Sequence, residues 1–199
     1  MPEVAPMLIV CAEVALVEAE LVGGGLSCPS CREVLGPWGH GRGRVLRCRS
    51  GDQWLRPRRA RCRGCLGTHV LLPDVCLLRR QDEVPVIGAA IMASIAGVGY
   101  RRIAGRLGVH ADTVRGWLRR FRDRAEVVRS HFTRCAVALD PELGAVMPAG
   151  SGVADAVEVI AVAGRAWVLR FGPADPWRIA SRLSGGELLA TRAPAFPWA

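Results

Sequence analysis

The sequence of 199 residues contains no lysine, so all 27 of its basic residues are arginine. This absence excludes a Walker phosphate-binding loop, a Schiff-base lysine and a kinase-type phosphate lysine, because each of these sites uses a lysine amine. Arginine binds phosphate as a permanently charged fork but is a poor general base. An arginine-only composition is typical of GC-rich genomes, so the positions of the arginines carry the functional information.

The sequence also lacks a long apolar run and an N-terminal export signal. The longest uncharged stretch, residues 84–100, has 17 residues and contains a proline and three glycines, and a membrane helix needs about 20 apolar residues. Residues 7–22 are mostly apolar, but three glutamates interrupt them and no basic residue precedes them. We therefore expect no membrane span and a cytoplasmic protein.

Eight cysteines need an explanation other than disulfides in a cytoplasmic chain. The segments 28–31 and 62–65 each have the pattern C-x2-C. Each such turn places two thiolates on one side of a tight loop, and two facing turns form a closed tetrahedral zinc site with no open position for water. The spacing therefore predicts a structural Zn²⁺ held by Cys28, Cys31, Cys62 and Cys65.

Other residues could replace one of these ligands. Cys48 is the nearest substitute cysteine, and His69 follows the second pair by four residues. The remaining cysteines are expected to be small buried side chains. A redox pair would require a βαβ setting, which neither pair has.

The charge is concentrated in the middle of the chain. Residues 28–134 carry 22 arginines against 8 acidic residues, a net charge of +14, whereas residues 1–27 have a net charge of −4 and residues 135–199 of −1. A basic block between neutral or acidic segments is typical of a region that binds a polyanion.

Part of this block lies between the two cysteine pairs. Alternate residues of a strand share a face, so Arg59, Arg61 and Arg63 could form a row suited to phosphate contact. Trp38 and Trp54 lie in the same basic segment as these arginines. One interpretation is that they stack on a base or a ribose; the one we favour is that they form a small core that covers the zinc.

After residue 86 the apolar spacing becomes helical. It predicts helices over about 86–95, 100–107 and 111–124, with turns at residues 97–99 and 108–110. Ala104 is a small residue where two helices touch, Gly108 supplies a left-handed turn residue, Val109 enters the core and Val114 anchors the third helix. This pattern is typical of a helix-turn-helix that binds DNA.

The third helix would present one face to the major groove. Arg115 and Arg119 are one turn apart and could each bind guanine, Thr113 could contact a thymine methyl or a phosphate, and Gly116 would allow close approach. Arg101, Arg102 and Arg120 are expected to hold phosphates, as are Arg59 and Arg61 between the cysteine pairs.

A zinc ribbon followed by a helix-turn-helix resembles the N-terminal DNA-binding half of insertion-sequence transposases. More closely, the runs at 56–63 (RPRRARCR), 68–73 (THVLLP) and 113–120 (TVRGWLRR) resemble an uncharacterised bacterial zinc-ribbon and helix-turn-helix family, a domain of unknown function. The resemblance covers about residues 15–125 and implies a DNA-binding role.

About 65 residues follow the helix-turn-helix, too few for the RNase H-like domain of a catalytic transposase, so we expect no enzyme. This tail begins with a linker over 141–152 and predicts helices over 153–171 and 176–183. It would pack on the helix-turn-helix or form a homodimer contact.

The expected fold is mostly α with a small β zinc ribbon. It is divided into a lead-in segment (1–27), a zinc-ribbon-like domain (28–80), a helix-turn-helix (81–130) and a linker with a short helical tail (131–199). The predicted function is sequence-specific binding of double-stranded DNA in the nucleoid, by a transcriptional regulator or a transposase-derived protein. The alternatives are a zinc-ribbon adaptor for a protein partner and a truncated or divergent transposase.

Overall fold

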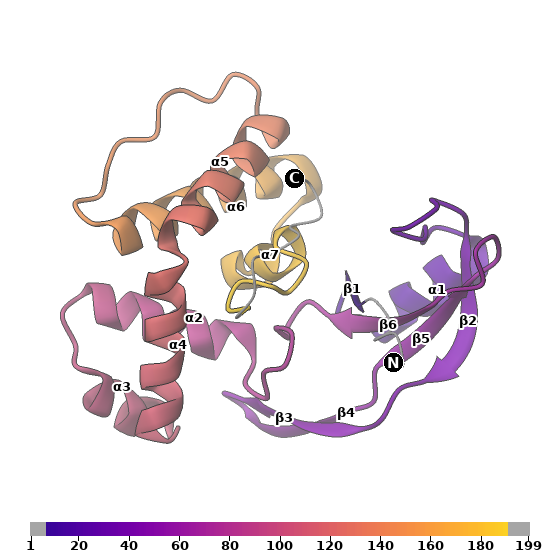
Figure 1. Ribbon diagram of the computed structural model, residues 1–199, viewed down its shortest axis with the longest axis horizontal. Helices are drawn as coiled ribbons and strands as arrows, with labels where there is room; N and C mark the ends of the chain where they lie inside the picture. The colour runs from indigo at the N-terminus through magenta and orange to yellow at the C-terminus, as the bar shows by residue number, and fades with distance from the viewer. Residues whose placement is uncertain (1–6, 191–199) are drawn as a thin grey trace.

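A computed structural model describes residues 7–190 of the chain and divides them into two packed regions (Figure 1). Residues 7–80, the sheet region, contain the strands and one helix. Residues 84–190, the helical region, contain six helices among the described residues. The elements of the sheet region are β1 (Met7–Val10), α1 (Val14–Gly23), β2 (Leu35–His40), β3 (Arg44–Cys48), β4 (Gly51–Leu55), β5 (Arg58–Cys62) and β6 (Thr68–Pro73).

The main sheet has four strands in the order β1-β6-β5-β2. β1 runs parallel to β6, with Met7 opposite Val70, while β5 is antiparallel to both of its neighbours. Helix α1 buries Val17 and Leu21 in the same small core as Leu35. Residues 7–27, which the sequence assigned to a separate lead-in segment, therefore contribute strand β1 and helix α1 to the sheet region; residues 1–6 of that segment lie outside the described residues.

Strands β3 and β4 form a separate two-stranded hairpin between β2 and β5. Leu46 on β3 is buried against Leu72 and Cys76, so one face of the hairpin packs on the end of the main sheet. The hairpin was not foreseen as a unit distinct from the zinc ribbon.

The helical region shares one core among all of its helices. The first three helices and the turns between them lie close to the expected ranges, and the final helix has the predicted bounds of residues 176 and 183. The helices are α2 (Val84–Ile95), α3 (Tyr100–Leu107), α4 (Ala111–Asp123), α5 (Ala125–Leu139), α6 (Gly152–Phe171) and α7 (Pro176–Leu183).

The tail packs on the helix-turn-helix, one of the two roles predicted for it. α5 continues directly from α4, so the expected boundary at residues 130 and 131 lies inside a helix. α7 places Trp177 over Gly88 of α2 so closely that a Cβ at position 88 would overlap the indole. The buried side chains of the described tail therefore belong to the same core as the helix-turn-helix; residues 191–199 lie outside the described range.

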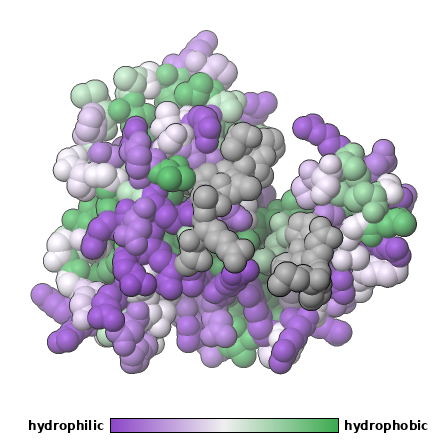
Figure 2. Space-filling model, viewed as in Figure 1, coloured by the Kyte–Doolittle hydropathy of each residue, from purple (hydrophilic) through white to green (hydrophobic). Residues whose placement is uncertain are grey.

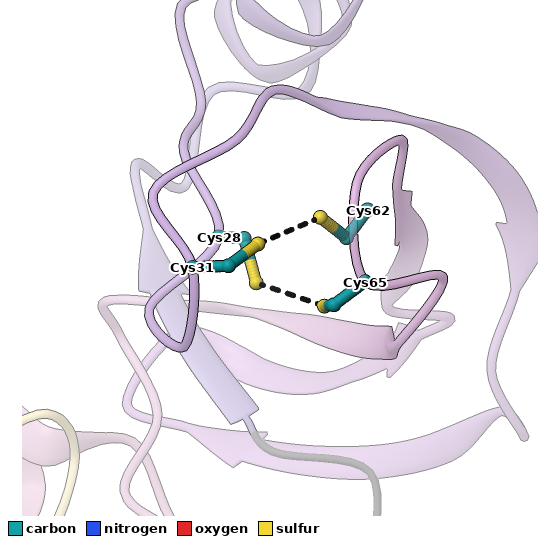
Figure 3. Close-up of side chains that lie close together, drawn as sticks. All are labelled: Cys28, Cys31, Cys62 and Cys65. Atoms are coloured by element: carbon teal, nitrogen blue, oxygen red, sulfur yellow. Dashed lines mark hydrogen bonds between the residues drawn. The ribbon is translucent and has the colours of Figure 1, made fainter.

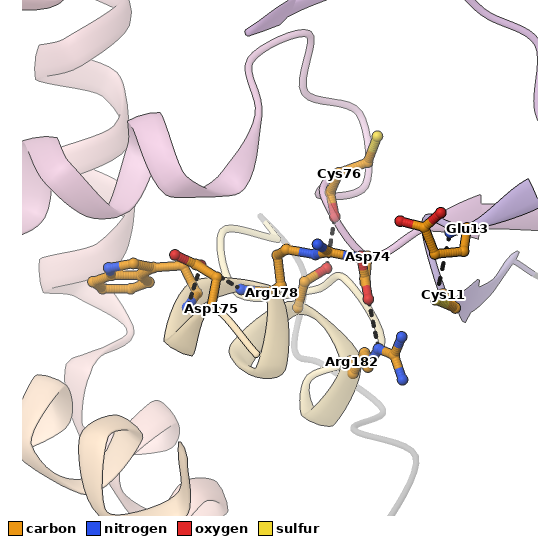
Figure 4. A network of polar contacts seen from close by, with 9 residues as sticks. Cys11, Glu13, Asp74, Cys76, Asp175, Arg178 and Arg182 are labelled. Carbon is orange, nitrogen blue, oxygen red and sulfur yellow. Dashed lines mark hydrogen bonds and ion pairs between the residues drawn. The ribbon is translucent and has the colours of Figure 1, made fainter. Parts of the chain in front are cut away.

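Two buried carboxylates join the regions. Asp74, at the end of β6, accepts hydrogen bonds from Arg178 (2.9 Å) and Arg182 (2.6 Å) of α7 (Figure 4). Asp82, just before α2, accepts two hydrogen bonds from Arg47 of β3, at 2.9 and 2.8 Å. Asp74 of the sheet region is bound by two arginines of α7, and Asp82, in the link that leads into α2, is bound by an arginine of β3, so these contacts fix the sheet region against the helices.

Candidate functional site

The four cysteines of the two C-x2-C pairs meet at one end of the main sheet (Figure 3). Their Sγ atoms all lie within 4.8 Å of one another, with 3.7 Å between Cys28 and Cys65 and 3.3 Å between Cys31 and Cys62. A tetrahedral site with Zn–S bonds of about 2.3 Å requires sulfur atoms about 3.8 Å apart. The four cysteines are thus positioned to bind a metal ion, in a geometry compatible with zinc.

The two cysteine turns have the same backbone form. The N–H of Cys28 donates to the carbonyl of Glu33 at 2.8 Å, and the N–H of Cys62 donates to the carbonyl of Gly67 at 2.9 Å, five residues on in both cases. The residue after each second cysteine has a left-handed φ, 64° for Arg32 and 61° for Leu66. Non-glycine residues rarely adopt this conformation, so both turns hold a strained residue to bring their thiols together.

The thiols of the site differ in pKa. The N–H of Gly67 lowers the pKa of Cys65, but hydrogen bonds with the other three thiols raise it to about 11. The pKa values of Cys28 and Cys62 are lowered instead. Burial acts to raise the pKa of Cys28, but the N–H groups of Cys31 and Ser30 outweigh it and hold the pKa below the usual value. The pKa of Cys62 is likewise lowered: burial raises it, and hydrogen bonds from Cys31 and from the backbone offset this effect. A lowered thiol pKa favours metal binding because the ligand is the thiolate.

Neither alternative ligand joins the group. His69 is buried with Nε2 at 3.4 Å from the Sγ of Cys28, so it contacts a ligand from outside the four-cysteine cluster. Cys48 lies on β3, where its thiol contacts the carbonyl of Leu46. The group that could hold the ion therefore consists of the four cysteines of the two pairs.

The expectation that the two tryptophans cover the zinc is wrong. Trp54 is 71% exposed and Trp38 is 47% exposed. The end of the sheet that holds the four cysteines is covered instead by α1, which contributes Val17 and Leu21 to the core around Cys28. This role of α1 was not predicted, because no local pattern in the N-terminal segment connects it with the two C-x2-C turns.

Two members of the predicted arginine row, Arg59 and Arg61, lie on β5, and both have partners within the chain; the third, Arg63, follows the end of the strand. Ala60 and Cys62 are buried on one face of β5, which leaves Arg59 and Arg61 on the other. Arg59 donates to Thr68 at 3.2 Å, and Arg61 stacks on Trp38 with 4.6 Å from Cζ to the ring centroid. Phosphate contact by these arginines stays a prediction.

The second candidate site is the surface of α4. Val114, Trp117 and Phe121 of this helix are buried against α2 and α3, as the apolar spacing predicted. Gly108 ends α3 with a left-handed φ of 64°, and Ala104 is buried. The buried face thus fixes which side of α4 points outward.

The opposite face of α4 is polar and arginine-rich, and Figure 2 shows hydrophilic side chains over this helix. Arg115 and Arg119 are exposed there, and Arg115 is 3.3 Å from Asp112, so these groups form a surface ion pair. A hollow of about 500 Å³ lies on this face, lined by Asp112, Arg115, Gly116, Arg119 and Arg120.

Gly116 forms the floor of this hollow. A Cβ at this position would lie 2.8 Å from the guanidinium of Arg120, which is the flexible end of a side chain. Thr113 is partly buried one turn earlier, and Arg101 and Arg102 are exposed on α3. Of the predicted base-contacting residues, Arg115, Gly116 and Arg119 line the hollow and Thr113 does not. The residues predicted to contact phosphate are divided among α3, α4 and β5.

One residue of this surface was not predicted. The side chain of His110 accepts a hydrogen bond from the N–H of Asp112 at 3.3 Å and so caps the N-terminus of α4. The signal in the sequence was its position directly before the helix, after the turn glycine.

Among residues 7–190, no helix is long and apolar enough to cross a membrane. Comparison of the chain with the curated proteins and with the solved structures finds no match. Residues 87–129, which span α2, α3, α4 and the start of α5, match the model of a homeodomain-like domain. This part of the chain is thus similar to a helix-turn-helix domain, and the similarity suggests DNA binding.

Proposed function

We propose that the protein is a zinc-stabilised, sequence-specific DNA-binding protein that places α4 in the major groove. The observation that carries this proposal is the exposed arginine face of α4 within the segment that matches a homeodomain-like domain. An α-helix fits the width of the major groove, where the base edges differ in their pattern of donors and acceptors.

Each side chain has a distinct role in this proposal. Arg115 and Arg119 each donate two hydrogen bonds to guanine O6 and N7, and Thr113 contacts a thymine methyl or a phosphate. Gly116 lets the helix backbone approach the bases, because it has no side chain and its near neighbour, the Arg120 guanidinium, is the flexible end of a side chain. Arg101, Arg102 and Arg120 hold backbone phosphates and set the orientation of the protein without reading sequence.

In this proposal the metal is structural. Four thiolates from Cys28, Cys31, Cys62 and Cys65 close the tetrahedral shell of Zn²⁺, which leaves no position for a substrate or an activated water. The proposed protein is not an enzyme. It acts in the cytoplasm, on the nucleoid, as a transcriptional regulator or as a DNA-binding protein derived from a transposase.

The second candidate function is an adaptor whose sheet region binds a protein partner, with a homodimer through the tail as a further possible assembly. The observation that favours the adaptor is Trp38, which lies half exposed on the open face of the sheet and stacks on Arg61. Trp38→Ala would then abolish partner binding, and Arg115→Ala would leave it intact.

Binding of labelled duplexes by fluorescence anisotropy tests the proposal. We expect the affinity of the wild-type protein to fall steeply with salt, because arginines that neutralise phosphates release counterions. The double variant Arg115→Ala/Arg119→Ala should lose its preference for a selected site, with each guanine contact contributing about 1–3 kcal/mol.

The matched control is Arg165→Ala/Arg170→Ala, which removes the same charge from exposed positions of α6. Its affinity should stay close to that of the wild-type protein. Equal losses in the two double variants would show that α4 contributes only charge and would overturn specific reading by this helix.

A further inference from the structure

We propose that the β3–β4 hairpin is a second DNA-contacting element, which binds the phosphate backbone beside the groove that α4 occupies. This inference rests on the proposed function. It assigns a role to the segment between the cysteine pairs, which the structure separates from the metal-binding turns.

The hairpin is attached to the start of the helix-turn-helix. Arg47 of β3 binds the buried carboxylate of Asp82 with two side-chain hydrogen bonds of 2.9 and 2.8 Å. Its N–H also donates to the carbonyl of Gln81 at 2.6 Å, and its carbonyl accepts from the N–H of Glu83 at 3.0 Å. Since α2 begins at Val84, these bonds hold the hairpin in a fixed position relative to the DNA-binding helices.

The point of attachment is close to α4. Arg80 precedes the attached residues, and its pKa is lowered, first by burial and then by the positive charge of Arg120 on α4. In Figure 1 the hairpin reaches from the sheet side of the molecule toward the helices, and Figure 2 shows hydrophilic side chains over both α4 and the hairpin. A duplex bound to α4 could therefore continue across the hairpin.

The outer face of the hairpin exposes two large apolar side chains. Val45 and Trp54 are paired across the two strands and are 44% and 71% exposed, while Leu46 on the other face is buried. The indole of Trp54 lies against Gly43, where a Cβ would overlap it. The ring is thus held against the strand with its other side open, which lowers the entropy that it would lose on binding.

The positive charge of the hairpin indicates a polyanionic partner. Residues 42–56 hold five arginines and a single acidic residue. Arg42, Arg49 and Arg56 are exposed, and none of them forms an ion pair with another described residue. An exposed cationic ribbon next to a DNA-reading helix is complementary to a phosphate backbone, and two-stranded ribbons have dimensions that suit DNA grooves.

The test compares two triple variants of the full chain on the same duplex. Arg42→Ala/Arg49→Ala/Arg56→Ala should weaken binding about 10- to 100-fold for every sequence and make the salt slope shallower by about three. Arg134→Ala/Arg165→Ala/Arg170→Ala removes equal charge from α5 and α6 and should change neither quantity appreciably. The base preference should be the same in both variants, because the hairpin contacts the backbone.

A photocrosslinker gives a readout that does not depend on affinity. Benzoylphenylalanine in place of Trp54 should crosslink to the duplex, whereas the same group in place of the exposed Leu169 on α6 should not. Two outcomes would overturn the hairpin contact: equal affinity and salt slope in the two triple variants, or no crosslink from position 54. In either case the wild-type protein would still bind DNA, and this binding would still depend on Arg115. If the proposed DNA-binding function itself is wrong, the wild-type protein will bind no duplex, which distinguishes that result from loss of the hairpin contact alone.

Discussion

Eight buried residues form the main core of the sheet region, and two of them, Cys28 and Cys62, belong to the four-cysteine cluster. The core of the helical region is larger, with 25 buried residues of its helices and of the segment after α7, joined by Leu77. Apolar burial stabilises a fold by roughly 25 cal/mol per Å², so the helical region can fold on this contribution. The small core of the sheet region cannot offset the conformational entropy of its strands and loops.

This difference explains why the metal site lies where it does. Zinc binding contributes directly to folding when the ligands come together only in the folded state. The helix-turn-helix needs no such support, because its inward face is covered by α5, α6 and α7. The following predictions test this contrast, beginning with the largest expected effect.

Loss of a buried zinc ligand should unfold the sheet region. Cys62→Ser removes a thiolate from the closed shell, so we expect loss of bound zinc and collapse of the sheet, while the helical region keeps its far-ultraviolet helical signal. Zinc content and hydrogen exchange resolved by peptide measure the two effects. Cys48→Ser is the control, because Cys48 lies outside the cluster; full zinc content in Cys62→Ser would contradict the assignment.

In the helical region, the corresponding sensitive point is the contact between α2 and α7. Gly88→Ala should lower the free energy of unfolding by about 2–3 kcal/mol, because the new methyl overlaps the indole of Trp177. Gly105→Ala on α3 meets open space and should be neutral or stabilising by up to about 1 kcal/mol. Thermal unfolding distinguishes them, and equal melting temperatures would show that the tail does not support the helix-turn-helix.

Asp74 tests whether the two regions unfold together. Asp74→Asn weakens both hydrogen bonds to Arg178 and Arg182, which are about 30% exposed, so the expected loss is about 2 kcal/mol. Calorimetry should show a single unfolding transition in the wild-type protein and two separate transitions in the variant. A single unchanged transition in the variant would show that this carboxylate does not couple the regions.

The smallest expected effect depends on pH. His131 is buried on α5 with Nε2 at 2.8 Å from the carbonyl oxygen of Leu183. Burial lowers the pKa of His131 below its usual 6.5, so protonation favours the unfolded chain. Its contribution to stability is complete above about pH 6.5 and should decrease as the pH falls below this value. Chemical denaturation at pH 7.5 and pH 5.5 should show a smaller pH dependence for His131→Gln than for the wild-type protein.

Local patterns in the sequence were sufficient to predict both candidate sites. The C-x2-C spacing fixes the geometry of each cysteine turn within a few residues, and the apolar spacing of Val114, Trp117 and Phe121 fixes the inward face of α4. Gly108 marked the turn between α3 and α4, since its left-handed φ is one that glycine adopts readily.

Features that depend on contacts between distant residues were not predicted. The parallel pairing of β1 with β6 joins residues about 60 positions apart, and no local pattern specifies it. Asp74 and Asp82 have no sequence feature that marks them as partners of Arg178 and Arg47. The exposure of Trp54 also depends on how the hairpin packs, so composition alone favoured a buried ring.

Selection of bound sequences from a random pool of duplex DNA tests the central claim most directly. We expect the wild-type protein to enrich one motif containing guanine, and Arg119→Ala to enrich the same motif with the preference lost at one position. An unchanged motif with Arg119→Ala, or no enrichment by the wild-type protein at low salt, would contradict the claim that α4 reads DNA.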